Sequence, residues 1–275
     1  MTKRTLLLLL TITTGFTSIA QVNEKDELFL SKRTPEPFLF SKTTLTSSDV
    51  PWSIDYSASY GERVSGQFGF DGVGQQLGLK GYLGKKFTLY GLAAFGFDPE
   101  HNVKSAQQVE IIHDFIGGTM VHGLKLGVGL GVGRDFSSVV SILSRATLSY
   151  DDINWKAGGN VLLQKSFSAN RDAVDIISSI GFHHRFFGNL YGGVEAVGED
   201  LEGFWDPEEA EGGAKLLVGP SLNMTTRDSR MSFSVSGGPV FYATQNQASN
   251  PDAIRELPAQ NGLTVRAKVI FNLSR

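Results

Sequence analysis

The chain has 275 residues, a net charge of −3, 32 glycines and 11% aromatic residues. Its length suits one large domain or two small ones. This charge balance lacks the strongly basic field of a nucleic-acid-binding protein, so no nucleic-acid partner is expected. The absence of cysteine excludes disulfides, thiolate zinc sites, cysteine nucleophiles and a lipid-modified cysteine.

Residues 1–20 predict a secretory signal peptide. Lys3 and Arg4 form a positive n-region, an apolar h-region begins at Leu6, and the small residues at 18–20 favour cleavage before Gln21. A buried first helix is the alternative. No later run of about 18 apolar residues occurs, so we expect no membrane-spanning helix. The pattern indicates an exported protein.

Residues 21–50 form a polar, irregular segment with prolines at Pro35 and Pro37 and one apolar knot at residues 38–40. We predict a periplasmic leader here, because little of the segment can contribute to a packed core. The alternative is a plug inside the lumen of the domain that follows.

From residue 51 onward, apolar and polar residues alternate with period two, as in strands that have one apolar face. The last segment is the clearest example, since Val265 and Val269 lie on one parity and Arg266 and Lys268 on the other. Turn or loop signals divide the chain into predicted strands at 52–70, 76–83, 87–97, 109–115, 124–132, 141–150, 153–164, 174–185, 190–198, 214–223, 231–242 and 262–275.

The connections sort into two alternating sets. Residues 84–86, 151–152 and 187–189 belong to the shorter set, whereas residues 199–212 and 244–261 belong to the longer one. Short periplasmic turns and long external loops are typical of transmembrane barrels. We therefore predict an all-β fold: a transmembrane antiparallel up-and-down β-barrel of about 12 strands over 51–275, with 10 or 14 as alternatives. A soluble lipocalin-like barrel or sandwich would also show alternation.

Most charged residues within the predicted strands lie opposite the apolar face. A lysine or arginine that faces lipid at mid-membrane costs about 2–4 kcal/mol, so this face should line the lumen. The predicted lumen-lining residues are Lys80, Glu110, Asp114, Lys125, Arg145, Lys156, Asp175, Arg185, Glu195, Lys215, Arg266 and Lys268.

Catalytic motifs are not apparent in the sequence. The run Gly127-Val-Gly-Leu-Gly-Val-Gly133 lacks the G-x-G-x-x-G spacing and is not followed by a helical pattern, so we interpret it as strand. The G-x-S-x-G elbow is absent as well. His183 and His184 are adjacent and should point to opposite faces of a strand, which prevents joint metal ligation. We expect no enzyme, no catalytic residue, no cofactor and no resident metal.

The acidic loop at 199–212 is the strongest candidate for a ligand site. Its carboxylates could hold a hard cation such as calcium, which takes 6–8 oxygen ligands, although the spacing differs from that of an EF-hand. The alternative is a solvated external loop, or one folded inward onto lumen cations. The candidate ligands are Glu202, Asp206, Glu208, Glu209 and Glu211.

This loop also carries a family resemblance. The block EDLEGFWDPEEAEGGAK, followed by LLVGPSLNM, resembles a segment of uncharacterised outer-membrane β-barrel proteins of Gram-negative bacteria, and the resemblance covers about residues 124–242. It implies a barrel and an outer-membrane location, but no activity or ligand. The terminal strand departs from the usual aromatic ending, because Phe271 is followed by Asn-Leu-Ser-Arg.

Three functional hypotheses follow. The first is a bacterial outer-membrane barrel that forms a passive, porin-like pore for small polar solutes or a structural barrel. The second is a surface binding or adhesion barrel that acts through the loops at 199–212 and 244–261. The third is a membrane-embedded hydrolase, which the missing motif disfavours. The expected partners are outer-membrane lipid, the barrel-assembly machinery and small polar solutes.

Overall fold

The computed structural model describes residues 38–42, 51–62, 64, 69–99, 102–117, 123–152, 154–168, 174–205, 214–226, 230–243 and 261–273. The predicted signal peptide lies outside the described residues, as does all of the predicted leader except residues 38–42. Within the described part, no helix is long and apolar enough to cross a membrane.

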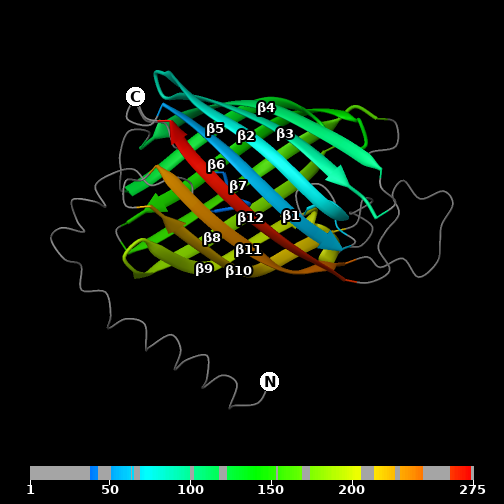
Figure 1. Ribbon diagram of the computed structural model, residues 1–275. Helices are drawn as coiled ribbons and strands as arrows, with labels where there is room; N and C mark the ends of the chain where they lie inside the picture. Colours follow the sequence, from blue (N-terminus) through cyan, green and yellow to red (C-terminus); the bar gives the residue numbers. More distant parts are fainter. Residues whose placement is uncertain are drawn as a thin grey trace, which may run out of the picture.

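The described residues form a closed antiparallel barrel of twelve strands (Figure 1). Each strand pairs with its neighbours in the sequence, and β1 pairs with β12 to close the ring. The strands are β1 (Trp52–Glu62), β2 (Gly72–Gly84), β3 (Phe87–Phe97), β4 (Val103–Ile116), β5 (Gly123–Arg134), β6 (Val140–Asp151), β7 (Trp155–Ser166), β8 (Asp175–Phe187), β9 (Leu190–Glu199), β10 (Lys215–Thr225), β11 (Met231–Tyr242) and β12 (Gly262–Leu273). The predicted fold and strand number are confirmed.

The closing pair joins the first and last strands, as the predicted up-and-down barrel requires. Arg266 lies opposite Ser59 and Lys268 opposite Ser57 in the β1–β12 register. Both cations are buried on the inner face, while Val265 and Phe271 are exposed on the outer face. Figure 1 shows β12, in red, running beside β1, in blue. Pairing the first strand with the last leaves the sheet without an open edge. A membrane-spanning sheet needs this closure because unpaired edge groups are costly in lipid.

The first strand is shorter than predicted. The sequence favours one strand over 52–70, but β1 ends at Glu62 and β2 begins at Gly72. Between them, Val64 and Phe70 are buried, and Phe70 packs against Phe136 with ring centroids 4.9 Å apart. These apolar side chains are therefore used for packing between strands, which an alternating pattern does not distinguish from continued strand.

The two ends of the barrel differ in their connections. The short-turn end carries two-residue turns such as Lys85-Lys86, between β2 and β3, and Gly188-Asn189, between β8 and β9. Lys85, Lys86 and Gly188 have positive φ angles of 49°, 65° and 50°, as tight hairpin turns demand. The long-loop end carries residues 200–214, which contain the 3-10 helix η2 (Leu201–Phe204), and residues 243–261. The predicted sorting of connections is therefore observed.

The outer surface of the barrel is apolar. Large hydrophobic side chains are exposed along every strand, for example Leu130, Ile180 and Val194. Aromatic residues gather outside at the short-turn end, where the rings of Tyr150 and Trp155 stack with centroids 4.7 Å apart. An apolar band with an aromatic border is the outer surface expected of a barrel in lipid.

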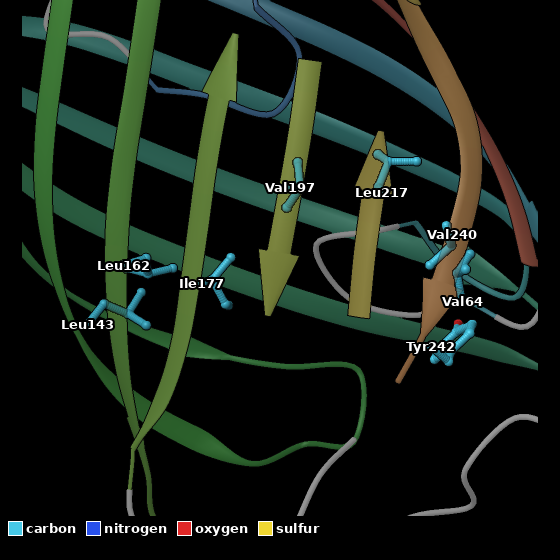
Figure 2. Close-up of a cluster of buried hydrophobic side chains, with 8 residues drawn as sticks. All are labelled: Val64, Leu143, Leu162, Ile177, Val197, Leu217, Val240 and Tyr242. Carbon is cyan, nitrogen blue, oxygen red and sulfur yellow. The ribbon is translucent and has the colours of Figure 1, made fainter. Parts of the chain in front are cut away.

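Inside the barrel lies an apolar cluster that the alternation does not predict (Figure 2). Its members sit near the long-loop end of their strands or in the β1–β2 connection, and they are joined by cross-strand pairs such as Leu162–Ile177 and Val197–Leu217. Phe40 packs against the cluster. The apolar cluster consists of Val64, Leu143, Leu162, Ile177, Val197, Leu217, Val240 and Tyr242.

Candidate functional site

The inner face carries the charges that the sequence predicts there. Eleven of the twelve predicted lumen-lining side chains are at most 9% exposed, and the other, Lys80, is half-buried on the inward parity of β2. The buried ones are Glu110, Asp114, Lys125, Arg145, Lys156, Asp175, Arg185, Glu195, Lys215, Arg266 and Lys268. Such burial means that protein atoms, rather than open water, surround most of these groups, so the lumen is well filled at their positions.

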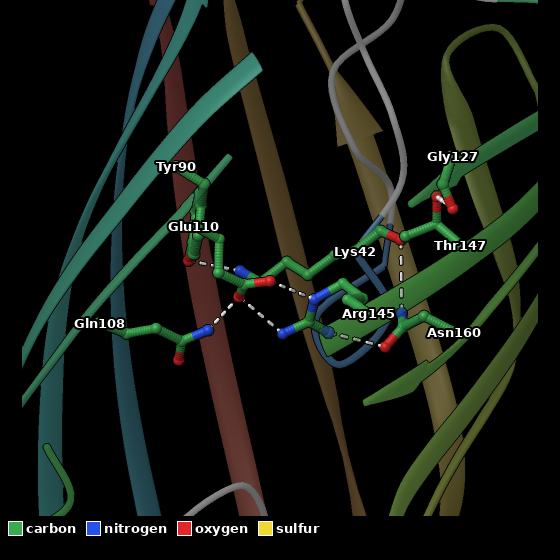
Figure 3. Close-up of polar contacts among 8 residues, drawn as sticks. All are labelled: Lys42, Tyr90, Gln108, Glu110, Gly127, Arg145, Thr147 and Asn160. Atoms are coloured by element: carbon green, nitrogen blue, oxygen red, sulfur yellow. Dashed lines mark hydrogen bonds and ion pairs between the residues drawn. The ribbon is translucent and has the colours of Figure 1, made fainter. Parts of the chain in front are cut away.

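The best-defined polar contact in the lumen is an ion pair between Arg145 of β6 and Glu110 of β4. Arg145 Nε and Nη2 donate to the two carboxylate oxygens of Glu110, each at 2.8 Å. Arg145 Nη1 also donates to Asn160 Oδ1 on β7 at 2.9 Å, and Gln108 donates to Glu110 (Figure 3). This bidentate geometry pairs both charges, and a buried charge needs such a partner to offset its desolvation.

A second buried carboxylate, Glu195 of β9, receives its hydrogen bonds from other groups. Ser221 of β10 donates to Oε1, while the backbone N–H groups of Leu39 and Phe40 both donate to Oε2 at 2.9 Å. Lys268 of β12 acts on the same carboxylate electrostatically. Residues 38–40 therefore contact the inner wall of the barrel.

Other predicted lumen residues pair near the short-turn end. Lys125 of β5 forms an ion pair with Asp151 of β6. Lys156 Nζ lies 5.2 Å from the ring centroid of Tyr191, a cation–π contact, and Arg185 Nε donates to the carbonyl of Gly188 in the β8–β9 turn. These contacts combine both signs of charge, so this end of the lumen is not a purely basic or acidic surface.

The acidic ligand site predicted in the loop after β9 is only partly described. Glu202 lies half-buried in η2, whereas Asp206, Glu208, Glu209 and Glu211 lie outside the described residues. The ligand prediction for those four residues therefore stays a prediction.

Three different carboxylates meet at the long-loop end. Asp175, Glu199 and Asp200 are buried, and each offers an oxygen within 4.8 Å of the others. Lys215 Nζ lies 3.4 Å from Glu199 Oε2 and balances one of the charges. The register gives the reason for this grouping, because β8 and β10 both flank β9 in the sheet. Sequence reasoning selected Asp175 and Lys215, but did not place Glu199 and Asp200 beside them.

Of these three carboxylates, Asp200 lies outside the strands. The pKa of its carboxyl is raised to about 6 from an ordinary 3.8, mainly by burial and in smaller part by the neighbouring Glu199 and Asp175. The backbone N–H of Ile176 donates to Asp200 Oδ1 at 2.9 Å, which acts in the opposite direction. Burial is the dominant cause.

The adjacent histidines of β8 lie on opposite faces, as the alternation predicts. His183 is fully buried and its ring packs on Phe38 with centroids 4.7 Å apart, whereas His184 is half-buried on the other parity. Their position agrees with the sequence argument that they do not share a metal. His101 and His122 lie outside the described residues.

Sequence reasoning missed the apolar cluster, although a signal for it exists. Leu143 stands two residues from Arg145, Leu162 two residues from Asn160, and Val197 two residues from Glu195, so each lies on the polar parity of its strand. In the barrel these positions gather near one end of the lumen. Several strands each carry an apolar residue on the lumen parity, at a similar distance from the long loops. This shared position would have predicted the apolar cluster.

Comparisons with known proteins support the barrel fold and nothing more specific. No family model matches the chain, and no curated protein matches it, so the resemblance of the acidic block stays a prediction. Among solved structures, the KdgM porin in complex with disordered oligogalacturonate is similar with a TM-score of 0.52 and 11% identity, over 80% of this chain and 99% of that chain. The NanC porin is similar with a TM-score of 0.53 and 9% identity, over 80% of this chain and 100% of that chain. At these identities the likeness shows a shared barrel fold.

Proposed function

We propose that this chain is a bacterial outer-membrane barrel that gives small polar or charged solutes a passive route through its lumen. The observation that carries the proposal is the division of one closed sheet into an apolar outer face and an inner face lined with charges of both signs. An apolar outer face of this extent would be a large exposed patch in water, but it is the expected surface in lipid.

The strands have the length that a membrane requires. They run from 10 residues in β9 to 14 residues in β4. About 9–11 tilted residues cross the hydrocarbon core of a bilayer, so each strand is long enough to span it. Eight-stranded barrels are generally filled by side chains and barrels of 16–18 strands hold aqueous channels. A twelve-stranded barrel lies between these cases, and its contents determine whether it conducts.

The charge arrangement supports small solutes as the substrate class. Three of the interior cations, Arg145, Lys125 and Lys215, are each paired with a carboxylate of the wall. A track built for an acidic polymer would instead present cations with few compensating carboxylates, because a polyanion binds through uncompensated positive charge. KdgM has been solved with an acidic oligosaccharide, and we propose that the present lumen passes smaller polar solutes of either charge.

Planar-bilayer recording tests the proposal directly. The refolded barrel should give discrete conductance steps, and Lys80→Glu should shift the ion preference towards cations because it reverses a charge on the inner face. Lys165→Glu is the matched control, since Lys165 is exposed on the outward parity of β7. The pore would be contradicted if correctly folded barrels give no conductance steps, both as wild type and in variants that weaken the contacts of residues 38–42 with the wall. That result would favour a structural barrel.

A further inference from the structure

Residues 38–42, which precede β1 in the sequence, lie inside the barrel. Phe38, Leu39 and Ser41 are 1%, 5% and 1% exposed. Their contacts reach across the ring of strands: Leu39 and Phe40 bond to Glu195 on β9, and Lys42 bonds through Nζ to the hydroxyl of Tyr90 on β3. β3 and β9 are six places apart in a ring of twelve, so the segment connects opposite walls.

The wall binds the main chain of this segment with both donors and acceptors. Glu195 accepts the N–H groups of Leu39 and Phe40, as described above, while Lys268 Nζ donates to the carbonyl of Phe38. At the other end, Asn160 Nδ2 donates to the carbonyl of Lys42 at 3.3 Å (Figure 3). Contacts to backbone groups from β7, β9 and β12 make this a built site for a bent peptide segment rather than a chance overlap.

Side chains complete the site. The ring of Phe38 packs on His183 and occupies the space over Gly181, where a Cβ would lie 3.0 Å from Phe38 Cγ. The guanidinium of Arg266 lies 5.0 Å from the ring centroid of Phe40, and Phe40 also packs against the apolar cluster. Lys42 Nζ lies 4.1 Å from the ring centroid of Tyr90. The segment therefore fills the region between the charged wall and the apolar cluster.

We propose that the lumen contains a binding site for a peptide segment, that residues 38–42 of this chain are its resident ligand, and that their binding closes the pore. The inference rests on the proposed pore function and adds a regulatory element to it. The chain has two states: in one the segment occupies the site and the lumen is blocked, and in the other the segment leaves and solutes pass. Substitutions that weaken the site shift the population towards the open state.

Occupancy can be tested without recording any current. The chain has no cysteine, so Phe38→Cys with Gly181→Cys introduces a single pair. The two Cβ atoms would lie at most about 4.5 Å apart, because Phe38 Cβ is one bond beyond Cγ, and this separation is within disulfide range. Oxidation in native outer-membrane vesicles should give near-complete cross-linking by mass spectrometry. Phe38→Cys with Gly91→Cys is the control, since Gly91 has open space around it.

Closure is tested by conductance in the same variants. Gly181→Ala places a methyl group against the Phe38 ring and alters no polar contact, so open probability should rise about tenfold or more, as expected for overpacking. Gly91→Ala, which meets nothing, should behave as wild type. Phe38→Ala should open the pore as well, which guards against misfolding of the Gly181 variant. The oxidised cysteine pair should stay closed and should conduct after reduction.

The outcomes separate the two proposals. If the cysteine pair does not form a disulfide, the segment does not occupy the lumen and the inference is wrong. If wild type conducts as freely as Phe38→Ala, the pore stands and its closure by residues 38–42 is refuted. If the disulfide forms but no variant conducts, including one that lacks residues 38–42, the pore function fails and the closing role fails with it.

Discussion

Two groups of side chains share the inner face of this barrel and are held in opposite ways. The charged group, made up of Glu110, Arg145, Glu195 and Lys268 with their neutral partner Asn160, is satisfied by directed hydrogen bonds and ion pairs. The apolar cluster near the long-loop end is held mainly by the packing of its hydrophobic side chains. Members of the two groups lie two residues apart on β6, β7 and β9. Inward orientation therefore does not by itself determine the polarity of a lumen position.

The difference shows how a filled barrel is stabilised. In the charged group the free energy depends on pairing, because a buried charge that loses its partner keeps its desolvation penalty. In the apolar cluster it depends on volume, because a truncated side chain leaves a cavity. Residues 38–42 use both modes, since their backbone bonds to Glu195 and Lys268 while Phe40 contacts the apolar cluster.

The largest expected effect is the loss of the ion pair on β6. Arg145→Met should lower the free energy of unfolding by about 3–5 kcal/mol, because Glu110 stays buried without its bidentate partner. Urea unfolding of the refolded barrel in detergent, followed by tryptophan fluorescence, measures this change. Arg134→Met is the matched control: Arg134 is exposed at the end of β5, so its loss should stay within about 0.5 kcal/mol.

A double variant tests the explanation for that loss. Adding Glu110→Gln to Arg145→Met removes the buried negative charge and should recover part of the stability. If the two substitutions lower the free energy of unfolding additively, so that the double variant is less stable than Arg145→Met, the loss does not come from an unpaired Glu110. Pairing is then not what distinguishes the charged group.

A smaller loss is expected in the apolar cluster. Leu217→Ala should lower the free energy of unfolding by about 2–4 kcal/mol, because Leu217 is 1% exposed and its removal opens a cavity beside Val197 and Val240. Leu222 lies on the same strand and is 44% exposed on the outer face, so Leu222→Ala should have a clearly smaller effect. Equal losses in the two variants would show that the apolar cluster is no better packed than the outer surface.

The smallest effect concerns the carboxylates beyond the apolar cluster. Burial raises the pKa of Asp200 to about 6, above its ordinary 3.8, so the folded chain holds this proton more tightly than the unfolded chain. Stability from this group is therefore present below about pH 4 and is lost as the pH rises to about 6 and above. The change should be about 1–3 kcal/mol, because each tenfold difference in proton affinity between the folded and unfolded chain corresponds to about 1.4 kcal/mol.

Asp200→Asn checks the origin of this pH dependence. The variant has no carboxyl proton to release at this position, so its stability between pH 4 and pH 7 should be flatter than that of wild type, measured by the same urea titrations. Glu202→Gln is the control, because this nearby carboxyl lies half-buried in η2. A wild-type curve that rises from pH 4 to pH 7, with the rise lost in Asp200→Asn, would contradict a raised pKa for Asp200.

Most of the barrel wall could be predicted because the alternation is local. Arg266, Lys268 and Lys156 lie on the inward parity that their neighbours predict, and a charged residue on the other parity would face lipid. The end of β1 was mispredicted for the same local reason, since Val64 and Phe70 extend the apolar pattern past Glu62 but are used inside the barrel. Parity alone does not say whether an apolar residue belongs to a strand or to a packed connection.

The contents of the lumen could not be predicted to the same extent. The sequence left residues 21–50 open between a periplasmic leader and a plug, and our proposal that residues 38–42 occupy the lumen is argued from the contacts of Phe38 and Lys42 with the wall. Those contacts join residues as far apart in sequence as Phe38 and Lys268. No local pattern encodes such pairings, because they depend on which side chains the closed ring brings face to face.

By itself, the sequence determined a closed antiparallel barrel with charges inside and apolar residues outside, because period two and the cost of charge in lipid act strand by strand. The tertiary structure decided which buried charges pair, where Leu162, Ile177 and Leu217 form an apolar cluster, and what fills the space between them. The physical reason is distance: alternation operates between neighbours in the chain, whereas the lumen is assembled from the inward faces of all twelve strands at once.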